Sequence, residues 1–247
     1  MSHLRLVFDP LGHLLDGIRA CEAEIFRREY GISNSEHLAE FDAYEDASVF
    51  VGLVGGDDEV YGMVRLLPPG TMKTLVQLQE PPWSVDAYRS VAAARIDLDS
   101  TWDVATMGLR SGLRPEFKSL RVRHSFALYH GLIQAARVNQ ASTFLAILDE
   151  RVRRLLNSVG IVMHALPGAT PQPFEGSRSS TPVYATVGPM LDRQRRELPD
   201  AHRLVTMGIG LTGVSVPPSE AFRHGRRAPV AVSAVGARSS ALVGDLW

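Results

Sequence analysis

The chain has 247 residues, 45% of them hydrophobic, and 26 Lys and Arg nearly balance 27 Asp and Glu. This length can bury a substantial core, and the balanced charge argues against a nucleic-acid binder or a disordered acidic chain. We expect one domain over residues 1–210 and a C-terminal extension or arm over 211–247. The first ten residues are too short and mixed for a signal peptide, and no apolar run approaches the ~18 residues of a membrane span. A cytoplasmic location follows.

The first hundred residues predict a strand, a helix and a hairpin. Leu4–Phe8 alternates as a short strand does, and the apolar residues of Leu11–Tyr30 recur at helical spacing up to Gly31. Ser48–Val54 and Glu59–Leu67 are rich in β-branched residues and are joined by a Gly-Gly-Asp-Asp turn. The Pro-rich segment 68–96 has no sustained period and is predicted as a partly helical excursion, of the kind that often covers a site.

The second hairpin strand contains an arginine, Arg65, among apolar neighbours, and an acidic run precedes the hairpin at Glu40, Asp42, Glu45 and Asp46. An unpaired charge removed from water is destabilising, so Arg65 should contact carboxylates or line a wet cleft. The acidic run is the nearest partner in sequence. The alternative interpretation is a solvated acidic loop and an arginine on an edge strand, because charge runs usually face solvent.

The second half predicts further strands and helices. Trp102–Leu109 is a strand, and Phe117–Val138 has a helical composition. Thr143–Leu148 is an apolar strand, Asp149 caps a helix that ends at Gly160, and Ile161–Ala165 completes a βαβ unit. We further predict a loop over 167–181, a strand over 182–187 and a last strand over 203–209.

Basic residues follow the Trp102 strand, including Arg110 and Arg114, and they precede a predicted helix start that can bind anions. A solvated helix face is the alternative. The eight histidines lack metal-ligand spacing, so no metal site is expected.

Three motifs together resemble the acyl-homoserine-lactone (autoinducer) synthase family. They are Glu40-Phe41-Asp42-x-Tyr44-Glu45, Gly62-x-x-Arg65-Leu66-Leu67-Pro68 and Trp102-Asp103-Val104, and their order and spacing match across roughly residues 20 to 185. The family belongs to the GNAT acyltransferase superfamily. The resemblance therefore implies an α+β fold, in which residues 1–210 form a GNAT-like three-layer α/β/α domain with a central mixed, V-split sheet.

The resemblance also implies roles for individual residues. Its catalytic residues would be Glu40, Asp42 and Asp103; its substrate-binding residues Glu45, Arg65, Phe26 and Thr106; and its acyl-donor-binding residues Met107, Arg110 and Arg114. Glu22 and Thr106 stand where the family has arginines, and a nearby tryptophan of the family is missing. These departures leave the acceptor open.

The expected function is an N-acyltransferase. It would move an acyl group from an acyl carrier protein or coenzyme A thioester to the amine of a small amino-acid-like acceptor. We expect this group to be a fatty acyl group. An acidic cluster would assist direct attack, with no tightly bound cofactor, no nucleic acid and an acyl carrier protein as possible partner. The alternatives are a GNAT acetyltransferase using acetyl-CoA and a non-catalytic binding module. GNAT acetyltransferases usually have the phosphate-loop pattern Q/R-x-x-G-x-G/A, and many have a tyrosine near the end of the helix that corresponds to 150–160. Both are absent from this sequence, which counts against acetyl-CoA as the acyl donor.

Overall fold

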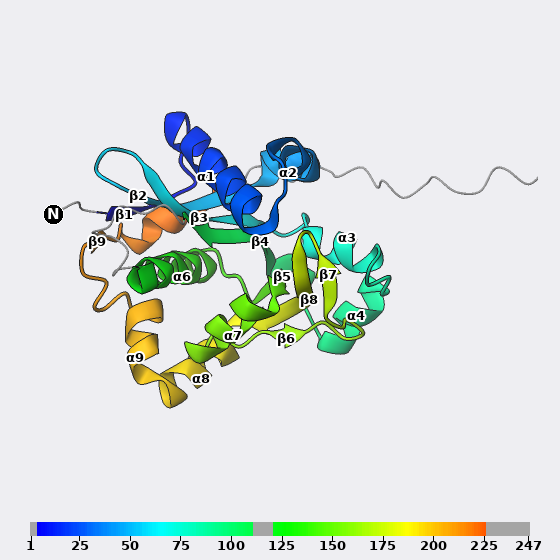
Figure 1. The fold of residues 1–247 in the computed structure, drawn as a ribbon. Helices are drawn as coiled ribbons and strands as arrows, with labels where there is room; N and C mark the ends of the chain where they lie inside the picture. Colours follow the sequence, from blue (N-terminus) through cyan, green and yellow to red (C-terminus); the bar gives the residue numbers. More distant parts are fainter. Residues whose placement is uncertain (1–3, 111–120, 226–247) are drawn as a thin grey trace, which may run out of the picture.

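A computed structural model describes residues 4–110 and 121–225 (Figure 1). In these residues nine strands form one mixed sheet in the order β6-β8-β5-β4-β3-β2-β1-β9, with β7 paired to β8. The strands are β1 (Leu4–Phe8), β2 (Val49–Val54), β3 (Val60–Leu67), β4 (Thr101–Leu109), β5 (Thr143–Asp149), β6 (His164–Ala165), β7 (Gln172–Phe174), β8 (Ser177–Thr186) and β9 (Val214–Ser215).

The helices lie on both faces of the sheet, as Figure 1 shows for α1 and α2 above it and α6 below it. The longer helices are α1 (His13–Tyr30), α2 (Asn34–Phe41), α3 (Lys73–Gln79), α4 (Ala87–Ala94), α6 (Arg121–Val138), α7 (Glu150–Ser158) and α8 (Val187–Glu197). The short ones are α9 (Pro199–Ala201), η1 (Asp42–Ala47), η2 (Leu98–Ser100), η3 (His202–Thr206) and η4 (Ser219–Phe222). The expected three-layer α/β/α arrangement is confirmed.

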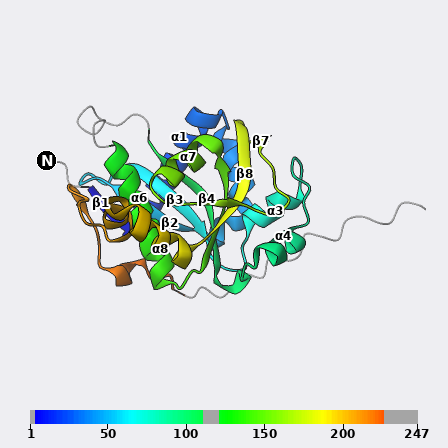
Figure 2. The same cartoon turned by 90° about the horizontal axis from the view of Figure 1, so that it is seen from below.

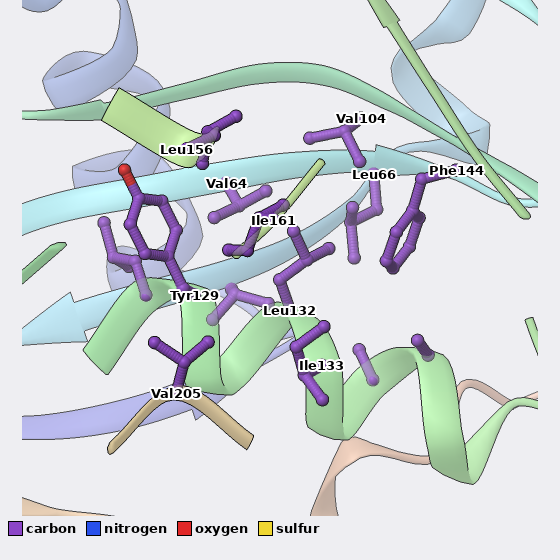
Figure 3. Close-up of a cluster of buried hydrophobic side chains, with 14 of the residues drawn as sticks. Val64, Leu66, Val104, Tyr129, Leu132, Ile133, Phe144, Leu156, Ile161 and Val205 are labelled. Carbon is purple, nitrogen blue, oxygen red and sulfur yellow. The ribbon is translucent and has the colours of Figure 1, made fainter. Parts of the chain in front are cut away.

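Each face of the sheet has its own hydrophobic cluster. On one face, Ile18, Cys21 and Ile25 of α1 pack against β2 and β3, because their spacing places them on one stripe of the helix. On the other face, Tyr129, Leu132 and Ile133 of α6 point toward residues of β3 and β4 (Figure 3). Strands β2 and β3 are therefore buried on both sides, which explains their continuous apolar sequences.

The sheet splits between β4 and β5. These parallel strands pair only over Thr101–Asp103 and Thr143–Leu145, although β4 continues to Leu109 and β5 to Asp149. On the other edge of β4, Arg65 pairs with Thr106 and Leu66 pairs with Val104, so Ala105 is an extra residue in a bulge. The V-shaped split expected between these two strands is confirmed.

The excursion between β3 and β4 forms α3 and α4, which lie at the end of the molecule away from β1 and α6 (Figures 1 and 2). Trp83 from this excursion packs on Phe174 of β7, with 4.9 Å between the ring centroids. The prediction of a loop over 167–181 was wrong in part, because β7 and the first half of β8 form a hairpin there. The high Pro, Gly and Ser content of this segment is typical of a loop, so the sequence did not indicate this short strand pairing.

The prediction of a last strand over 203–209 was wrong. His202–Thr206 is a π-helical turn, and the N–H of Met207 donates to the carbonyl of His202. Nδ1 of His130 on α6 donates a hydrogen bond to the carbonyl of the buried Val205 at 2.9 Å, a contact that an extended strand would lose. In the described part of the expected C-terminal extension, β9 pairs with β1, and Phe222 is fully buried in the α6 cluster.

Candidate active site

A cavity of about 100 Å³ occupies the split between β4 and β5, and we call it the split cavity. Its walls come from α1, the first turn of α3, the β7–β8 turn and the two separated strands. The lining residues that carry side chains able to bind or move protons are Tyr30, Lys73, Thr74, Thr106, Asp149, Glu175, Ser177 and Ser180. The sheet topology therefore brings together polar groups from segments far apart in the sequence.

Two further cavities adjoin the split cavity through shared residues. The outer cavity, about 480 Å³, lies between α1, the end of β4, α6 and α7, and it shares Tyr30, Met107 and Val152 with the split cavity. The inner cavity, about 30 Å³, is lined entirely by apolar residues, including Val104, Met107 and Leu148. Met107 lines all three cavities and therefore stands at their junction.

Arg65 is only 2% exposed, and each of its three guanidinium nitrogens donates to an acceptor. Its Nε and Nη2 donate to the carboxylate of Glu22 at 3.0 and 2.7 Å, and Nη1 donates to Glu45 at 2.8 Å and to the Ser48 hydroxyl at 2.7 Å. The guanidinium also lies between the rings of Phe41 and Phe50, with centroids at 4.4 and 4.7 Å. The expectation that Arg65 contacts carboxylates is confirmed for Glu45, but its main partner is Glu22.

Glu22 and Thr106, the two residues that stand where the family motifs have arginines, contact each other. The Thr106 hydroxyl donates to Oε1 of the fully buried Glu22, and His37 lies 3.3 Å from Oε2. Burial acts to raise the pKa of Glu22, but His37 and Arg65 outweigh it and lower this pKa to about 2. Glu22 follows Cys21 on the buried stripe of α1, a position from which its pairing with Arg65 could have been inferred.

Asp103 is fully buried and anchors α3 rather than lining the split cavity. Its carboxylate accepts from the backbone N–H of Thr74 at 2.6 Å and from the Thr74 hydroxyl at 2.8 Å. Burial raises the pKa of Asp103 to about 6, against the opposing effects of Thr74 and Lys73. Asp103 therefore connects β4 to the first turn of α3, where Lys73 and Thr74 enter the cavity wall.

Glu40, Lys73 and Glu175 form a second charged cluster, which we call the triad. Lys73 Nζ donates to Glu40 and lies 3.9 Å from Glu175, and it also faces the Phe41 ring at 4.9 Å. Burial and the neighbouring Glu40 carboxylate raise the pKa of Glu175 to about 8. Burial opposes ionisation of Glu40 as well, but its contacts with Glu175 and Lys73 lower its pKa. Sequence analysis missed Lys73 and Glu175.

The remaining predicted site residues lie in different places. Phe26 lines the split cavity and packs on His37 at 4.9 Å, whereas Asp42 is exposed in η1. Arg110 donates to Glu24 at 2.8 Å and to Glu59 at 3.1 Å. Arg114 lies outside the described residues.

Neither a metal centre nor a membrane span is found in residues 4–110 and 121–225. No three of their His, Cys, Asp and Glu side chains are grouped so that they could hold a metal ion. No helix in these ranges has the length and apolar content needed to cross a membrane.

Comparison of folds places the chain beside acyl-homoserine lactone synthases and an N-acyl amino acid synthase. The CoA-dependent synthase BjaI, solved with SAM and isopentyl-CoA, matches with a TM-score of 0.53 and 16% identity over 90% of this chain and 97% of its own. FeeM, an N-acyl amino acid synthase from uncultured soil microbes, matches with 0.55 and 12% identity over 78% and 96%. The AHL synthase LasI matches with 0.53 and 12% identity over 76% and 92%.

These matches confirm the fold class that the three sequence motifs implied. No protein-family model and no curated protein sequence matches the chain. At 12 to 16% identity the structural likeness establishes the fold, and the site itself must carry the argument for function. The chain thus has a fold like that of the acyl-homoserine lactone synthases, and its split cavity holds a different set of charged residues from the one the motifs suggested.

Proposed function

We propose that the protein is an N-acyltransferase that moves an acyl group from a thioester to the amine of a small molecule. The observation that carries this proposal is the cavity at the β4–β5 split. It joins a polar wall to an apolar pocket through Met107, and the backbone of Val104–Met107 forms one side. The BjaI, LasI and FeeM folds support the same reading, since all three proteins are named as acyl-homoserine lactone or N-acyl amino acid synthases.

The split strand offers backbone donors for the developing oxyanion. Past Asp103 the edge of β4 has no partner residue in β5, and Ala105 has none in β3. Strand edges without a partner present N–H groups, and such groups stabilise the oxyanion of a tetrahedral intermediate when they are fixed in place. In this proposal the thioester carbonyl lies against Ala105 and Thr106.

The outer cavity is the proposed entry for the donor. Phe126, Tyr129 and Leu155 provide apolar walls for a pantetheine arm, which acyl carrier proteins and coenzyme A share. The acyl group then passes Met107 into the inner cavity. Because about 30 Å³ holds little more than one water-sized group, only the end of a short acyl chain fits there without displacement of side chains.

The buried charges have supporting roles in this proposal. Arg65, Glu22, Glu45 and Thr106 fix α1 against β3 and β4, and Asp103 positions the first turn of α3. Glu40 acts through its contacts with Lys73 and Glu175 at the cavity wall. The exposed Asp42 has no part in it.

The test is a transfer assay with purified protein. Acetyl-, butanoyl- and octanoyl-CoA, and the same acyl groups on an acyl carrier protein, are incubated with a pool of small amines. We expect amine-dependent release of free thiol and one N-acyl product per thiol, measured by a thiol reagent and mass spectrometry. Saturable binding of the donors without any amine-dependent release would refute the enzyme and favour a non-catalytic module.

A further inference from the structure

We propose that the acceptor is a cationic amine without a carboxylate beside it, and that Glu175 receives the proton this amine loses. The inference rests on the proposed acyl transfer and names the substrate class of the same site. It follows from the charges around the split cavity and from the carboxylates that already contact the nearby Lys and Arg side chains.

The triad has room for one additional positive charge. With both carboxylates ionised, Glu40 and Glu175 contribute two negative charges and Lys73 one positive charge, which leaves one negative charge at the wall of a small cavity. A buried charge is stable only with a partner of opposite sign. An incoming ammonium group supplies that partner and removes the reason for Glu175 to remain protonated.

A carboxylate on the acceptor would find no free cation in this cavity. Among the described lining residues of the split cavity Lys73 is the one cation, and it already contacts two carboxylates. Arg65 does not line the cavity; its donors are directed to Glu22, Glu45 and Ser48, and two rings cover its faces. Arg151 lines the outer cavity and donates to Asp149.

Asp149 is also unfavourable to an acceptor carboxylate. It lines the split cavity and accepts from the Ser177 hydroxyl at 2.6 Å, and its pKa is lowered by that contact and by Arg151 in spite of its burial. A second carboxylate at this wall would therefore face Asp149 as well as Glu40 and Glu175. Like charges brought together without water between them repel each other and weaken binding.

The β7–β8 turn fixes Glu175 at this position. Gly176 has a φ of +76°, and a Cβ there would lie 2.2 Å from the carbonyl oxygen of Tyr30. The turn therefore packs directly on the last residue of α1, and Glu175 lies beside Lys73 and Glu40 at the cavity wall.

The reaction balances with Glu175 as the proton acceptor. The ionised Glu175 removes one proton from the ammonium, and the amine nitrogen then forms the C–N bond with the thioester carbonyl carbon. The C–S bond breaks as the tetrahedral intermediate collapses, and the thiolate takes a second proton from the nitrogen. The amide keeps the third hydrogen, and Glu175 returns its proton to solvent. A base with a pKa near the working pH suits this step.

Matched pairs of acceptors test the substrate class. Agmatine is compared with arginine, tyramine with tyrosine and putrescine with ornithine, because the members of each pair differ by one carboxylate. With the three acyl groups supplied on coenzyme A and on an acyl carrier protein, we expect kcat/KM for the amine to exceed that for the amino acid by more than about tenfold. Equal or better acylation of the amino acids would overturn the inference and leave acyl transfer standing. Acylation of neither set, with either kind of donor, would remove the proposed function itself.

Substitution of Glu175 tests its role. Glu175→Gln should lower kcat about 100-fold or more at unchanged melting temperature, and Glu175→Asp should recover part of that loss. Glu80→Gln, at the exposed C-terminal end of α3, is the matched control and should act as the wild type. A Glu175→Gln enzyme that keeps wild-type kcat would overturn the assignment.

Discussion

Glu22 of α1 and Thr106 of β4 are joined by a hydrogen bond beneath the split cavity, and the same carboxylate binds Arg65 through two nitrogens. Both residues stand where the resembling family has arginines. With Glu22 and Thr106 at these positions, this region lacks the two positive charges of the family, and Glu22 gives Arg65 a buried partner. The charge available to a substrate consequently shifts to the triad of Glu40, Lys73 and Glu175.

The Glu22–Arg65 pair should be essential for stability. Glu22→Gln leaves a buried guanidinium without its main counter-charge, so we expect the free energy of unfolding to fall by about 3–5 kcal/mol. Glu24→Gln is the matched control, two residues further along the same helix. It removes a half-buried partner of Arg110 and should change stability by less than about 1 kcal/mol. Urea unfolding measures both. Equal losses of unfolding free energy in the two variants would contradict the role of Glu22 as the main buried counter-charge of Arg65.

Asp103 should make stability fall as the pH rises. Its pKa is raised from 3.8 to about 6 in the folded protein, so the folded state holds this proton more tightly than the unfolded state does. The associated stability is complete below pH 3.8 and is lost as the pH rises through 6. Asp103→Asn does not titrate, so its stability relative to wild type should increase over this interval, by about 3 kcal/mol at most. A difference in unfolding free energy between Asp103→Asn and wild type that does not change with pH would disprove the raised pKa of Asp103.

Met107 should control acyl-chain length from its place between the three cavities. Met107→Ala enlarges the passage to the inner cavity, so octanoyl-CoA should gain about tenfold in kcat/KM relative to acetyl-CoA, equivalent to about 1.4 kcal/mol. Met207→Ala removes the same atoms at an exposed position and should leave the chain-length profile unchanged. An unchanged profile in the Met107 variant would place the acyl group elsewhere.

Gly176 should be needed for activity because of the close approach to Tyr30. Gly176→Ala combines an unfavourable positive φ, worth about 1–2 kcal/mol, with a collision against backbone. Gly12→Ala has a similar φ of +62° but open space around its Cβ, so it isolates the first effect. We expect both variants to lose some stability and only Gly176→Ala to lose transfer activity. Parallel losses in the two variants would show that the turn does not position Glu175.

The pH dependence of transfer should report Glu175. Its pKa is raised to about 8 by burial and by Glu40, with Lys73 opposing, and the titratable groups Tyr30 and Asp149 line the same cavity. The proton acceptor must be ionised, so kcat/KM should rise as the pH increases through about 8 in the wild type. Lys73→Met removes the opposing charge and should move this rise to higher pH. A profile that is flat between pH 6 and 9 would exclude Glu175 as the base.

The sequence was sufficient to predict most of the scaffold and the contact of Arg65 with a carboxylate of the acidic run. Strong periodicity located α1, β2, β3 and β5 within one or two residues, and the charge of Arg65 required acidic partners. The choice of partner was harder. Glu22 was interpreted only as a departure from a motif, although its place on the apolar stripe of α1 marks it as buried.

Lys73 and Glu175 could not be predicted in the same way. They come from segments without periodicity, about a hundred residues apart, and they meet only because the β7–β8 turn packs on the end of α1 and Asp103 fixes the first turn of α3. Asp103 illustrates the converse. Its position in the family motif predicted a catalytic residue, whereas the structure assigns its two oxygens to Thr74.

The central claim is that a thioester carbonyl is attacked inside the β4–β5 split. A crystal structure with a 2-oxoalkyl coenzyme A analogue, which keeps the carbonyl but cannot release the thiol, tests this most directly. We predict its oxygen within hydrogen-bonding distance of a backbone N–H of Val104–Met107, and its chain directed past Met107 into the inner cavity. An analogue bound with its carbonyl outside the split, away from β4 and Glu175, would contradict the account.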